Sequence, residues 1–493
     1  MKRIYWQLGR RKKIVSIVSN RVLLINPIRI RPVVGPIAFD YLGYALKRAG
    51  YTVDLVDHCF QDLKESLAPY LRKKQPLAVG ITVRNTDDCY FQSQHSFLDE
   101  IKEVIYYIKS FQTAPIILGG VGFSINPKVI MEYCGVDFGV QRDGEDAFPR
   151  FLKALQANQE FEQIPNLIFR KNGEIVENPV SYIDLNQFKP PRDLINNQRY
   201  FQEGGQGNIE TKRGCDQKCI FCADPICKGN VIRLKDPDSV CFEFKALIQQ
   251  GVNSFHLCDS EFNIPITHAK QVCHAIIENE LQNQMTWYTY CAPNPFDEEL
   301  AHLMKSAGCV GINFGVDSGD DLVLRNLRRT HRARDIIQVV EFCRKNRITV
   351  MLDLLVGGPG ETPKSIKNTI RLMKELQPDR AGLSIGVRIY PGTELAYMVE
   401  NDGPLLNNPD IYGVKENNST FLKPIFYLSS EMGGNSVFSY ISQLIGNDPM
   451  FFFANPEAKD QNYNYNENQI LVDAIKTGFQ GAYWDILRKI HND

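Results

Sequence analysis

The sequence lacks the marks of a membrane protein and of a disulfide-stabilised secreted protein. It has no run of 18 or more apolar residues, which a helix would need to cross a bilayer. Its 13 cysteines are an odd number scattered over 493 residues, unlike the paired cysteines of a disulfide scaffold. We therefore expect a cytoplasmic protein that works in a reducing compartment.

The sequence also lacks an excess of charge of either sign. Lys and Arg number 56 against 57 Asp and Glu, for a net charge of -1. Binding to a phosphate backbone needs a basic surface, so nucleic acid is not favoured as a partner. The basic residues between Met1 and Val15 are accompanied by no apolar core or cleavage site. Residues 1–20 are therefore predicted to be a basic, solvated extension.

The most informative stretch runs from Cys215 to Cys222, where Cys215, Cys219 and Cys222 are spaced C-x3-C-x2-C. Such a loop suits three irons of a 4Fe-4S cubane and leaves the fourth iron without a protein ligand. Structural zinc or plain buried thiols are the alternative, but the nearest further thiol, Cys227, lacks a finger-like spacing. Phe221 completes the pattern C-x3-C-x-aromatic-C, and here the chain resembles the radical S-adenosylmethionine (SAM) superfamily.

This resemblance implies a mechanism. In that superfamily SAM chelates the open iron, and one electron from the cluster splits SAM into methionine and a 5'-deoxyadenosyl radical. The protein's part is to position the reactants and exclude water. The resemblance thus implies the three cysteines as metal ligands, Phe221 beside the cofactors, and an external one-electron donor similar to flavodoxin or ferredoxin. The motifs hold no obvious acid–base pair, so no side chain is predicted to be catalytic.

Residues 21–150 alternate between strand-like and helix-like segments. A helix is expected from Phe39 to Ala49, and strands are expected over residues 22–27, 52–56, 78–83 and 115–118. This rhythm predicts an α/β domain with a doubly wound, Rossmann-like parallel sheet. Its ligand should lie at the carboxyl ends of the strands.

A sheet of this kind before a radical SAM domain resembles the cobalamin-binding domain of the cobalamin-dependent radical SAM enzymes. Residues 81–85, 118–120 and 143–145 look like that group's corrinoid-contacting loops. The resemblance implies contacts from Gly119, Gly120, Gly144 and Glu145, and a lower face near Arg84, Asn85 and Asp87.

The D-x-H-x-x-G signature of proteins that place a histidine on cobalt is absent. His58 is therefore predicted to be an ordinary loop residue, and the cobalt to have no histidine below it. The alternative is a sheet that binds no corrinoid, since parallel sheets with glycine loops bind many things or nothing.

Residues 151–207 are predicted to be a connector with a small hairpin turning at Asn172-Gly173. Residues 208–400 return to the βα rhythm and predict a partial (β/α)6 TIM barrel with functional residues at its strand ends. The expected strands cover residues 209–212, 254–257, 285–290, 310–316, 349–356 and 382–389. Residues 401–493 are predicted to be a mostly helical cap over the open side of the barrel.

The SAM contacts follow from the resemblance, strand by strand. Asp259, Ser260 and above all Glu261 occupy the position that holds the SAM amino group, although a solvated loop carboxylate is the plain alternative. Asp317 and Ser318 match the ribose position, although a simple turn also uses Asp-Ser-Gly. Glycine allows close approach of a flat ligand, and a guanidinium suits a carboxylate. The remaining assignments are the adenine to Gly357 and Gly358, and the SAM carboxylate to Arg388.

Together these features resemble a cobalamin-dependent radical SAM C-methyltransferase acting on an unactivated carbon. The resemblance implies that one SAM provides the 5'-deoxyadenosyl radical and a second methylates the cobalamin, which then passes its methyl group to a small-molecule or peptide substrate. Three alternatives remain open: a cyclase or rearrangement enzyme with the same cofactors, a radical SAM enzyme without corrinoid, and a non-catalytic cluster protein.

Overall fold

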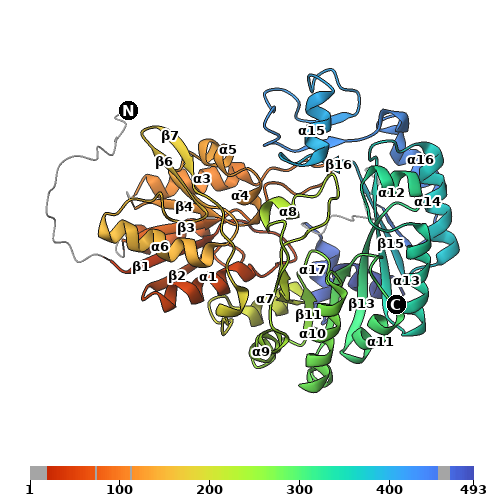
Figure 1. Ribbon diagram of the computed structural model, residues 1–493, viewed down its shortest axis with the longest axis horizontal. Helices are drawn as coiled ribbons and strands as arrows, with labels where there is room; N and C mark the ends of the chain where they lie inside the picture. Colours follow the sequence, from red (N-terminus) through yellow and green to blue (C-terminus); the bar gives the residue numbers. More distant parts are fainter. Residues whose placement is uncertain (1–18, 73–74, 112–113, 454–466, 493) are drawn as a thin grey trace.

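The computed structural model describes residues 19–72, 75–111, 114–453 and 467–492, and it contains two α/β units side by side (Figure 1). The predicted extension at residues 1–20 lies almost wholly outside the described residues. Within these ranges, no helix is long and apolar enough to cross a membrane.

The N-terminal unit is built on a seven-stranded sheet in the order β2-β1-β3-β4-β5-β6-β7. Five strands pair in parallel: β1 (Arg21–Asn26), β2 (Thr52–Asp57), β3 (Ala78–Thr82), β4 (Ile116–Gly119) and β5 (Phe138–Val140). Its helices are α1 (Ile37–Arg48), α2 (Leu63–Arg72), α3 (Leu98–Lys109), α4 (Val121–Ile125), α5 (Pro127–Cys134) and α6 (Gly144–Ala157). Apolar strands buried on both faces need helices on both sides, so the doubly wound prediction is confirmed.

The predicted hairpin forms β6 (Leu167–Lys171) and β7 (Glu174–Glu177). Asn172 and Gly173 both have positive φ, 53° and 93°, as a two-residue hairpin turn of this hand requires. The hairpin pairs antiparallel with β5 and so extends the first sheet. Part of the segment predicted as a connector therefore belongs to the N-terminal unit, and the rest holds η1 (Leu185–Gln187) and α7 (Asn197–Gly204).

The second unit is a partial parallel barrel in the order β19-β15-β14-β13-β12-β11-β8. Its strands are β8 (Gly207–Ile209), β11 (Ser254–Leu257), β12 (Thr286–Cys291), β13 (Cys309–Asp317), β14 (Thr349–Val356), β15 (Arg380–Ile385) and β19 (Phe451–Phe453). Helices on its outside are α9 (Pro237–Ile248), α10 (Ile266–Glu278), η2 (Leu281–Asn283), α11 (Glu298–Ser306), α12 (Asp321–Asn326), α13 (Ala333–Lys345) and α14 (Pro363–Leu376).

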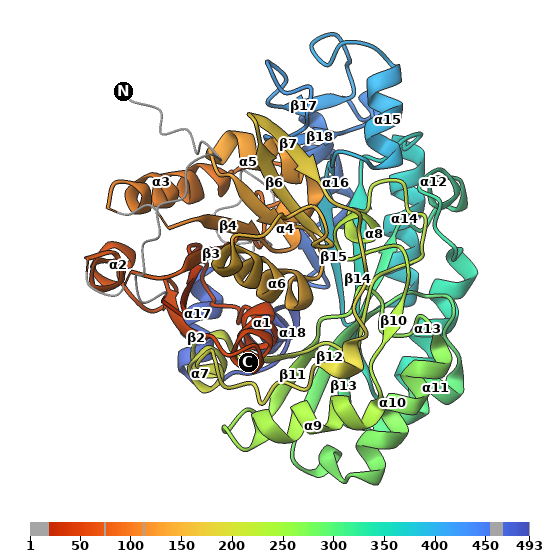
Figure 2. The same ribbon diagram turned by 60° about the vertical axis from the view of Figure 1, so that its left-hand side comes forward.

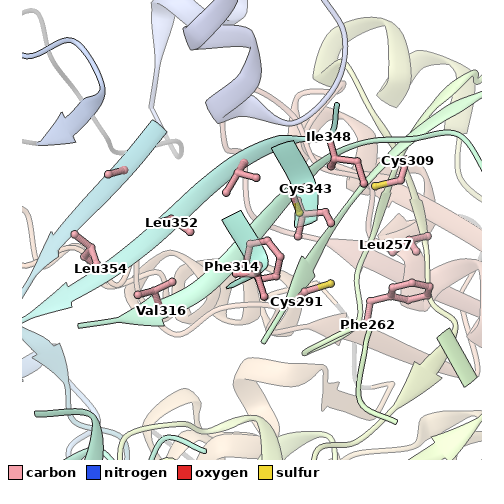
Figure 3. Packing of buried hydrophobic residues seen from close by; sticks show 14 of the residues in the cluster. Leu257, Phe262, Cys291, Cys309, Phe314, Val316, Cys343, Ile348, Leu352 and Leu354 are labelled. Atoms are coloured by element: carbon pink, nitrogen blue, oxygen red, sulfur yellow. The ribbon is translucent and has the colours of Figure 1, made fainter. Parts of the chain in front are cut away.

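The six predicted barrel strands are all present, with differences at two of them. The first ends at Ile209, because Lys212 and Arg213 form β9 (Lys212–Arg213) and pair antiparallel with β10 (Arg233–Leu234). The last predicted strand is divided into β15 and β16 (Val387–Arg388), and Gly386 between them has φ 77°. The barrel core lies between the strands and the outer helices, where thiols pack as small apolar groups among larger side chains (Figure 3).

The C-terminal region contains the predicted helices and also strands. Its elements are α15 (Glu394–Asn401), β17 (Ile411–Gly413), β18 (Ile425–Tyr427), η3 (Ser430–Met432), α16 (Ser436–Ile445), α17 (Gln469–Lys476) and α18 (Tyr483–Asn492). Strands β16, β18 and β17 form a small antiparallel sheet, whereas β19 adds a seventh strand to the barrel by pairing in parallel with β15.

Helix α18 packs on the inner face of the barrel sheet, on the side that faces the N-terminal unit (Figure 2). Trp287 packs under the outer helices against Phe262, so the alternation of a strand turns Tyr288 inward. There Tyr288 lies edge-on to Trp484, with ring centroids 6.1 Å apart, and its hydroxyl donates to Asp485 at 2.7 Å. The cap thus fills part of the barrel's interior.

Candidate active site

The three cysteines lie on the loop between β9 and α8 (Asp224–Cys227). Gly214 opens this loop with φ 94°, and a Cβ there would lie 2.2 Å from the carbonyl oxygen of Val231. The Cys215 amide donates to the Gly229 carbonyl at 3.0 Å, and the Cys222 amide donates to the Cys219 carbonyl at 3.3 Å. These backbone constraints hold the cysteines at one side of the barrel mouth.

The thiols are near enough to influence one another's ionisation. Burial raises the pKa of the Cys222 thiol, and Asp224, Cys219 and Cys215 raise it further. Burial also raises the pKa of Cys215, to about 11. Such a loop holds three thiolates only with a compensating cationic partner, which a cluster provides. Within the described ranges, no three Cys, His, Asp or Glu side chains are placed to bind a single metal ion. In a 4Fe-4S cubane, by contrast, each thiolate binds a different iron.

A buried arginine joins the cysteine loop to the strand ends. Arg329 Nη1 donates to Cys219 Sγ at 3.0 Å, and Arg329 Nε lies 3.0 Å from Asp317 Oδ2. Its Nη2 donates to the Gly315 carbonyl at 2.5 Å and lies 3.5 Å from Glu261 Oε1. Sequence reasoning missed Arg329, because it stands in an arginine-rich run that is typical of a solvated helix end.

Glu261 is the predicted SAM contact whose surroundings fit a cofactor best. Burial raises the pKa of its carboxyl to about 7, and Arg329 opposes this. Its Oε2 atom is buried and has no hydrogen-bond partner among the residues that the structure describes. A buried oxygen of this kind calls for a missing partner, such as an ammonium group or a metal ion.

The side chains of Asp259 and Ser260 make hydrogen bonds within the protein that stabilise the loop. The Asp259 carboxylate accepts from the Thr211 amide at 2.9 Å and from the Lys212 amide at 3.2 Å. Ser260 Oγ donates to Asp224 Oδ2 at 2.5 Å. Their contact with SAM stays a prediction.

Most of the residues assigned to the ribose and the adenine of SAM also make contacts within the protein. Asp317 faces Arg329, but the fully buried Ser318 directs its Oγ toward Thr369 Oγ1 at 3.1 Å. At Gly357 a Cβ would lie 2.4 Å from Leu428, and at Gly358 it would lie 3.0 Å from Leu327. Close packing of the protein itself therefore accounts for both glycines, and adenine contact stays a prediction.

Arg388 and Asp87 form one buried ion pair. Arg388 Nη2 donates to Asp87 Oδ2 at 2.8 Å, and Nε donates to the same oxygen at 3.1 Å. Its other hydrogen bonds go to the carbonyls of Ile389, Ile425 and Phe421, and its guanidinium lies 4.7 Å from the centroid of the Tyr390 ring. Each side chain neutralises the other across the domain boundary, and the contacts of Arg388 with the SAM carboxylate and of Asp87 with the corrinoid stay predictions.

The edge of the N-terminal sheet carries the predicted corrinoid loops. Arg84 and Asn85 follow β3 and line a pocket with seven other residues: Asn26, Ile28, Ile30, Val34, Pro36, Cys59 and Phe97. Gly120, with φ 106°, brings the next loop against β3, since a Cβ there would lie 2.6 Å from the Val83 carbonyl. Gly119 leaves more room, as its nearest atom would be the Val140 carbonyl at 3.5 Å.

The third predicted corrinoid loop is tied to the barrel. Glu145 is buried and lies 3.0 Å from Arg213, while Asp143 pairs with Arg213 at 2.8 Å and also with Arg233. Gly144 has more open surroundings, since a Cβ there would lie no nearer than 3.7 Å to any neighbour, the side chain of Leu42. Glu145 thus contacts Arg213 of strand β9, which precedes the cysteine loop. Its contact with a corrinoid stays a prediction.

His58 lies in the loop after β2, where it is half-buried and its Nδ1 lies 3.0 Å from the Gln61 carbonyl. That the cobalt has no histidine below it stays a prediction.

The two strand edges face each other. Cys258, which follows β11, is exposed, yet burial by the surrounding protein raises its pKa to about 11, and Arg84 of the other unit is close enough to oppose this. The site therefore combines a cysteine loop on a barrel with a sheet edge directed at it.

This combination defines a class of protein, and comparisons with known families agree. Residues 209–373 match the model of the radical SAM superfamily, and residues 26–152 match that of the B12 binding domain. The chain is 31% identical to tryptophan 2-C-methyltransferase of Streptomyces laurentii over 441 residues, which is 76% of this chain and 74% of that protein.

Solved structures agree over nearly the whole chain. The radical SAM methyltransferase TsrM of Kitasatospora setae, solved with tryptophan and a SAM analogue, is 28% identical with a TM-score of 0.87, covering 96% of this chain and 99% of that one. Another TsrM structure contains cobalamin and a 4Fe-4S cluster. The cobalamin-dependent radical enzyme OxsB, at 16% identity and a TM-score of 0.70, shares the fold over 86% of this chain and 66% of its own. This chain belongs to the cobalamin-dependent radical SAM enzymes.

Proposed function

We propose that the protein is a C-methyltransferase that uses SAM, a 4Fe-4S cluster and cobalamin on a small indole-containing substrate. The observation that supports this most is the opposed placement of the cysteine loop with Glu261 and the sheet edge with Arg84. When bound, SAM supplies the methyl group and the radical, the cluster supplies the electron, and the corrinoid carries the methyl group. An external one-electron donor is part of this proposal.

The protein's own residues bind and orient these groups. Cys215, Cys219 and Cys222 hold the cluster, and the unpartnered oxygen of Glu261 is placed for the amino group of SAM or the open iron. Arg84 and Asn85 line the pocket beside the sheet edge. Cys215 is buried, and Cys219, Cys222 and Glu261 are only partly exposed, which limits the access of water to the reacting groups.

The indole assignment derives from the relatives. The Streptomyces protein is named as a tryptophan 2-C-methyltransferase, and TsrM was solved with tryptophan bound. Both relatives align with this chain across both domains, so the surroundings of a bound substrate should be similar. An unactivated carbon on a small molecule or peptide is the wider class.

The test uses anaerobically reconstituted protein, cobalamin, a one-electron reductant, tryptophan and SAM labelled at its methyl carbon. Methyl transfer predicts the label in a methylated product together with S-adenosylhomocysteine. Formation of 5'-deoxyadenosine in a comparable amount would support the radical route. Cys219→Ala, which should lack a complete cluster, is the matched control.

Three outcomes would contradict the proposal. An unlabelled product accompanied only by 5'-deoxyadenosine would favour the cyclase or rearrangement alternative. A protein that binds no corrinoid would favour the alternative without cobalamin. Label that enters other acceptors but never tryptophan would reject the indole substrate and retain methyl transfer.

A further inference from the structure

Arg329 is a strong hydrogen-bond donor that the structure directs at a predicted cluster ligand. Its Nη1 lies 3.0 Å from Cys219 Sγ, and its side chain is 10% exposed. The carboxylates of Asp317 and Glu261, at 3.0 and 3.5 Å, fix the guanidinium from the other side. The Gly315 carbonyl accepts from Nη2, so the arginine cannot swing away without losing four partners.

The guanidinium keeps its proton in this position. An arginine guanidinium is not deprotonated in proteins, and the carboxylates of Asp317 and Glu261 face it here. A permanent positive charge therefore remains next to the sulfur throughout the working pH range. The planar fork of arginine allows this contact with the sulfur and the two carboxylates at once, which a lysine ammonium cannot reproduce.

Hydrogen bonds to cluster sulfurs and nearby charges set the reduction potential of iron–sulfur clusters. Reduction adds one electron and makes the cluster more negative, so a fixed cation and an N–H donor at a ligand sulfur stabilise the reduced form. From these contacts we propose that Arg329 is a tuning residue that raises the reduction potential of the cluster. This inference rests on the proposed cluster and adds a role for a residue that no motif identified.

The direct measurement is a redox titration of the reconstituted holoenzyme without SAM, followed by electron paramagnetic resonance of the reduced cluster. Loss of a charge-assisted hydrogen bond in Arg329→Gln should shift the one-electron equilibrium about tenfold toward the oxidised form, or about 59 mV. Arg328→Gln is the matched control, because Arg328 is exposed and paired with Glu394 at 3.0 Å. The control should titrate like the wild type.

A second measurement takes its main result from wild-type protein, so it does not depend on a variant that could fail to assemble a cluster. Wild-type protein carrying arginine labelled with nitrogen-15 in its guanidino group should show nitrogen-15 hyperfine coupling to the reduced cluster. Arg329→Lys should abolish that coupling. Equal potentials in Arg329→Gln and wild type, an equal shift in the Arg328 control, or no coupling in labelled wild type would each overturn the inference.

These failures are distinct from failure of the proposed function. If wild-type protein with iron and sulfide forms no cluster, the proposed function itself is wrong. If the cluster forms and the potential is insensitive to Arg329, the function stands and only the tuning role is lost.

Discussion

At the scale of single residues, the Asp87–Arg388 pair joins the two domains through one buried ion pair. Both side chains are nearly inaccessible, at 0% and 6% exposed. Removing one partner of such a pair leaves an uncompensated buried charge, which costs far more than the pair contributes.

We therefore expect Asp87→Asn to lower the free energy of unfolding by about 3–5 kcal/mol, measured by urea denaturation. The control is Asp193→Asn, because Asp193 pairs with Lys47 across 3.0 Å at an exposed site and should cost about 1 kcal/mol or less. Asp87→Leu combined with Arg388→Met should recover much of the loss. A single Asp87 variant as stable as the control would show that the pair is not buried in solution.

Glu361 gives a prediction about pH. Burial raises the pKa of its carboxyl to about 8, although it accepts from the Gly357 amide at 2.5 Å. The folded state then holds a proton that the unfolded state releases near its ordinary pKa of about 4.3. Stability must fall as pH rises between these two values and become level above the upper one.

Urea denaturation of wild type and Glu361→Gln at intervals from pH 5 to pH 8.5 isolates this effect. The stability of the wild type relative to the variant should decline with rising pH, by at most about 4 kcal/mol over the window. A difference that is constant with pH would mean that Glu361 is ionised in the folded protein throughout.

At the scale of elements, local patterns predicted what is determined locally. The strand at Thr349–Val356 and the turn at Asn172-Gly173 have the predicted bounds, since β-branched runs and an Asn-Gly pair carry their own conformational preference. Pairings between distant segments were missed. Phe451–Phe453 gives no sign in sequence that it pairs with β15, and Arg388 meets Asp87 across 301 positions of chain. The cysteine loop was predictable because its ligands are close in sequence. Arg329 was not, because it contacts Cys219 from the distant segment between α12 and α13.

Helix α18 is an element whose importance no motif indicated. Trp484 is buried against Tyr288 and Met351 on the inner face of the barrel. Trp484→Ala should leave a cavity and lower the free energy of unfolding by about 3–5 kcal/mol. Ile470→Ala on the neighbouring helix α17, where the side chain is 46% exposed, should change it by about 0.5 kcal/mol or less. Equal effects in urea denaturation would show that α18 does not pack inside the barrel.

At the scale of the whole molecule, buried charges join the two units through the connector. Arg192 lies 2.8 Å from Asp40 of α1 and 3.0 Å from Glu243 of α9, and Lys235 lies 2.8 Å from Glu243. The Tyr41 hydroxyl also donates to Glu243, at 2.6 Å. One arginine of the connector therefore neutralises an acidic residue from each unit.

We expect Arg192→Met to uncouple the units, because buried Asp40 would lose the cation that faces it and Glu243 would keep only Lys235. Differential scanning calorimetry should show one transition for the wild type and two for the variant. Arg199→Met on α7, where Arg199 makes an exposed pair with Glu203, is the control and should keep one transition. A single transition for Arg192→Met would mean that apolar packing alone couples the units.

The position of α18 in the chain also affects how the barrel folds during translation. All the barrel strands, β19 included, are synthesised before α18. The edge of β15 stays unpaired until β19 follows, and Tyr288 and Met351 stay uncovered until α18 follows. Open strand edges and uncovered apolar faces are recognised by chaperones and lead to aggregation. The interior of the barrel therefore stays accessible during translation until Trp484 has been synthesised and packs against Tyr288 and Met351.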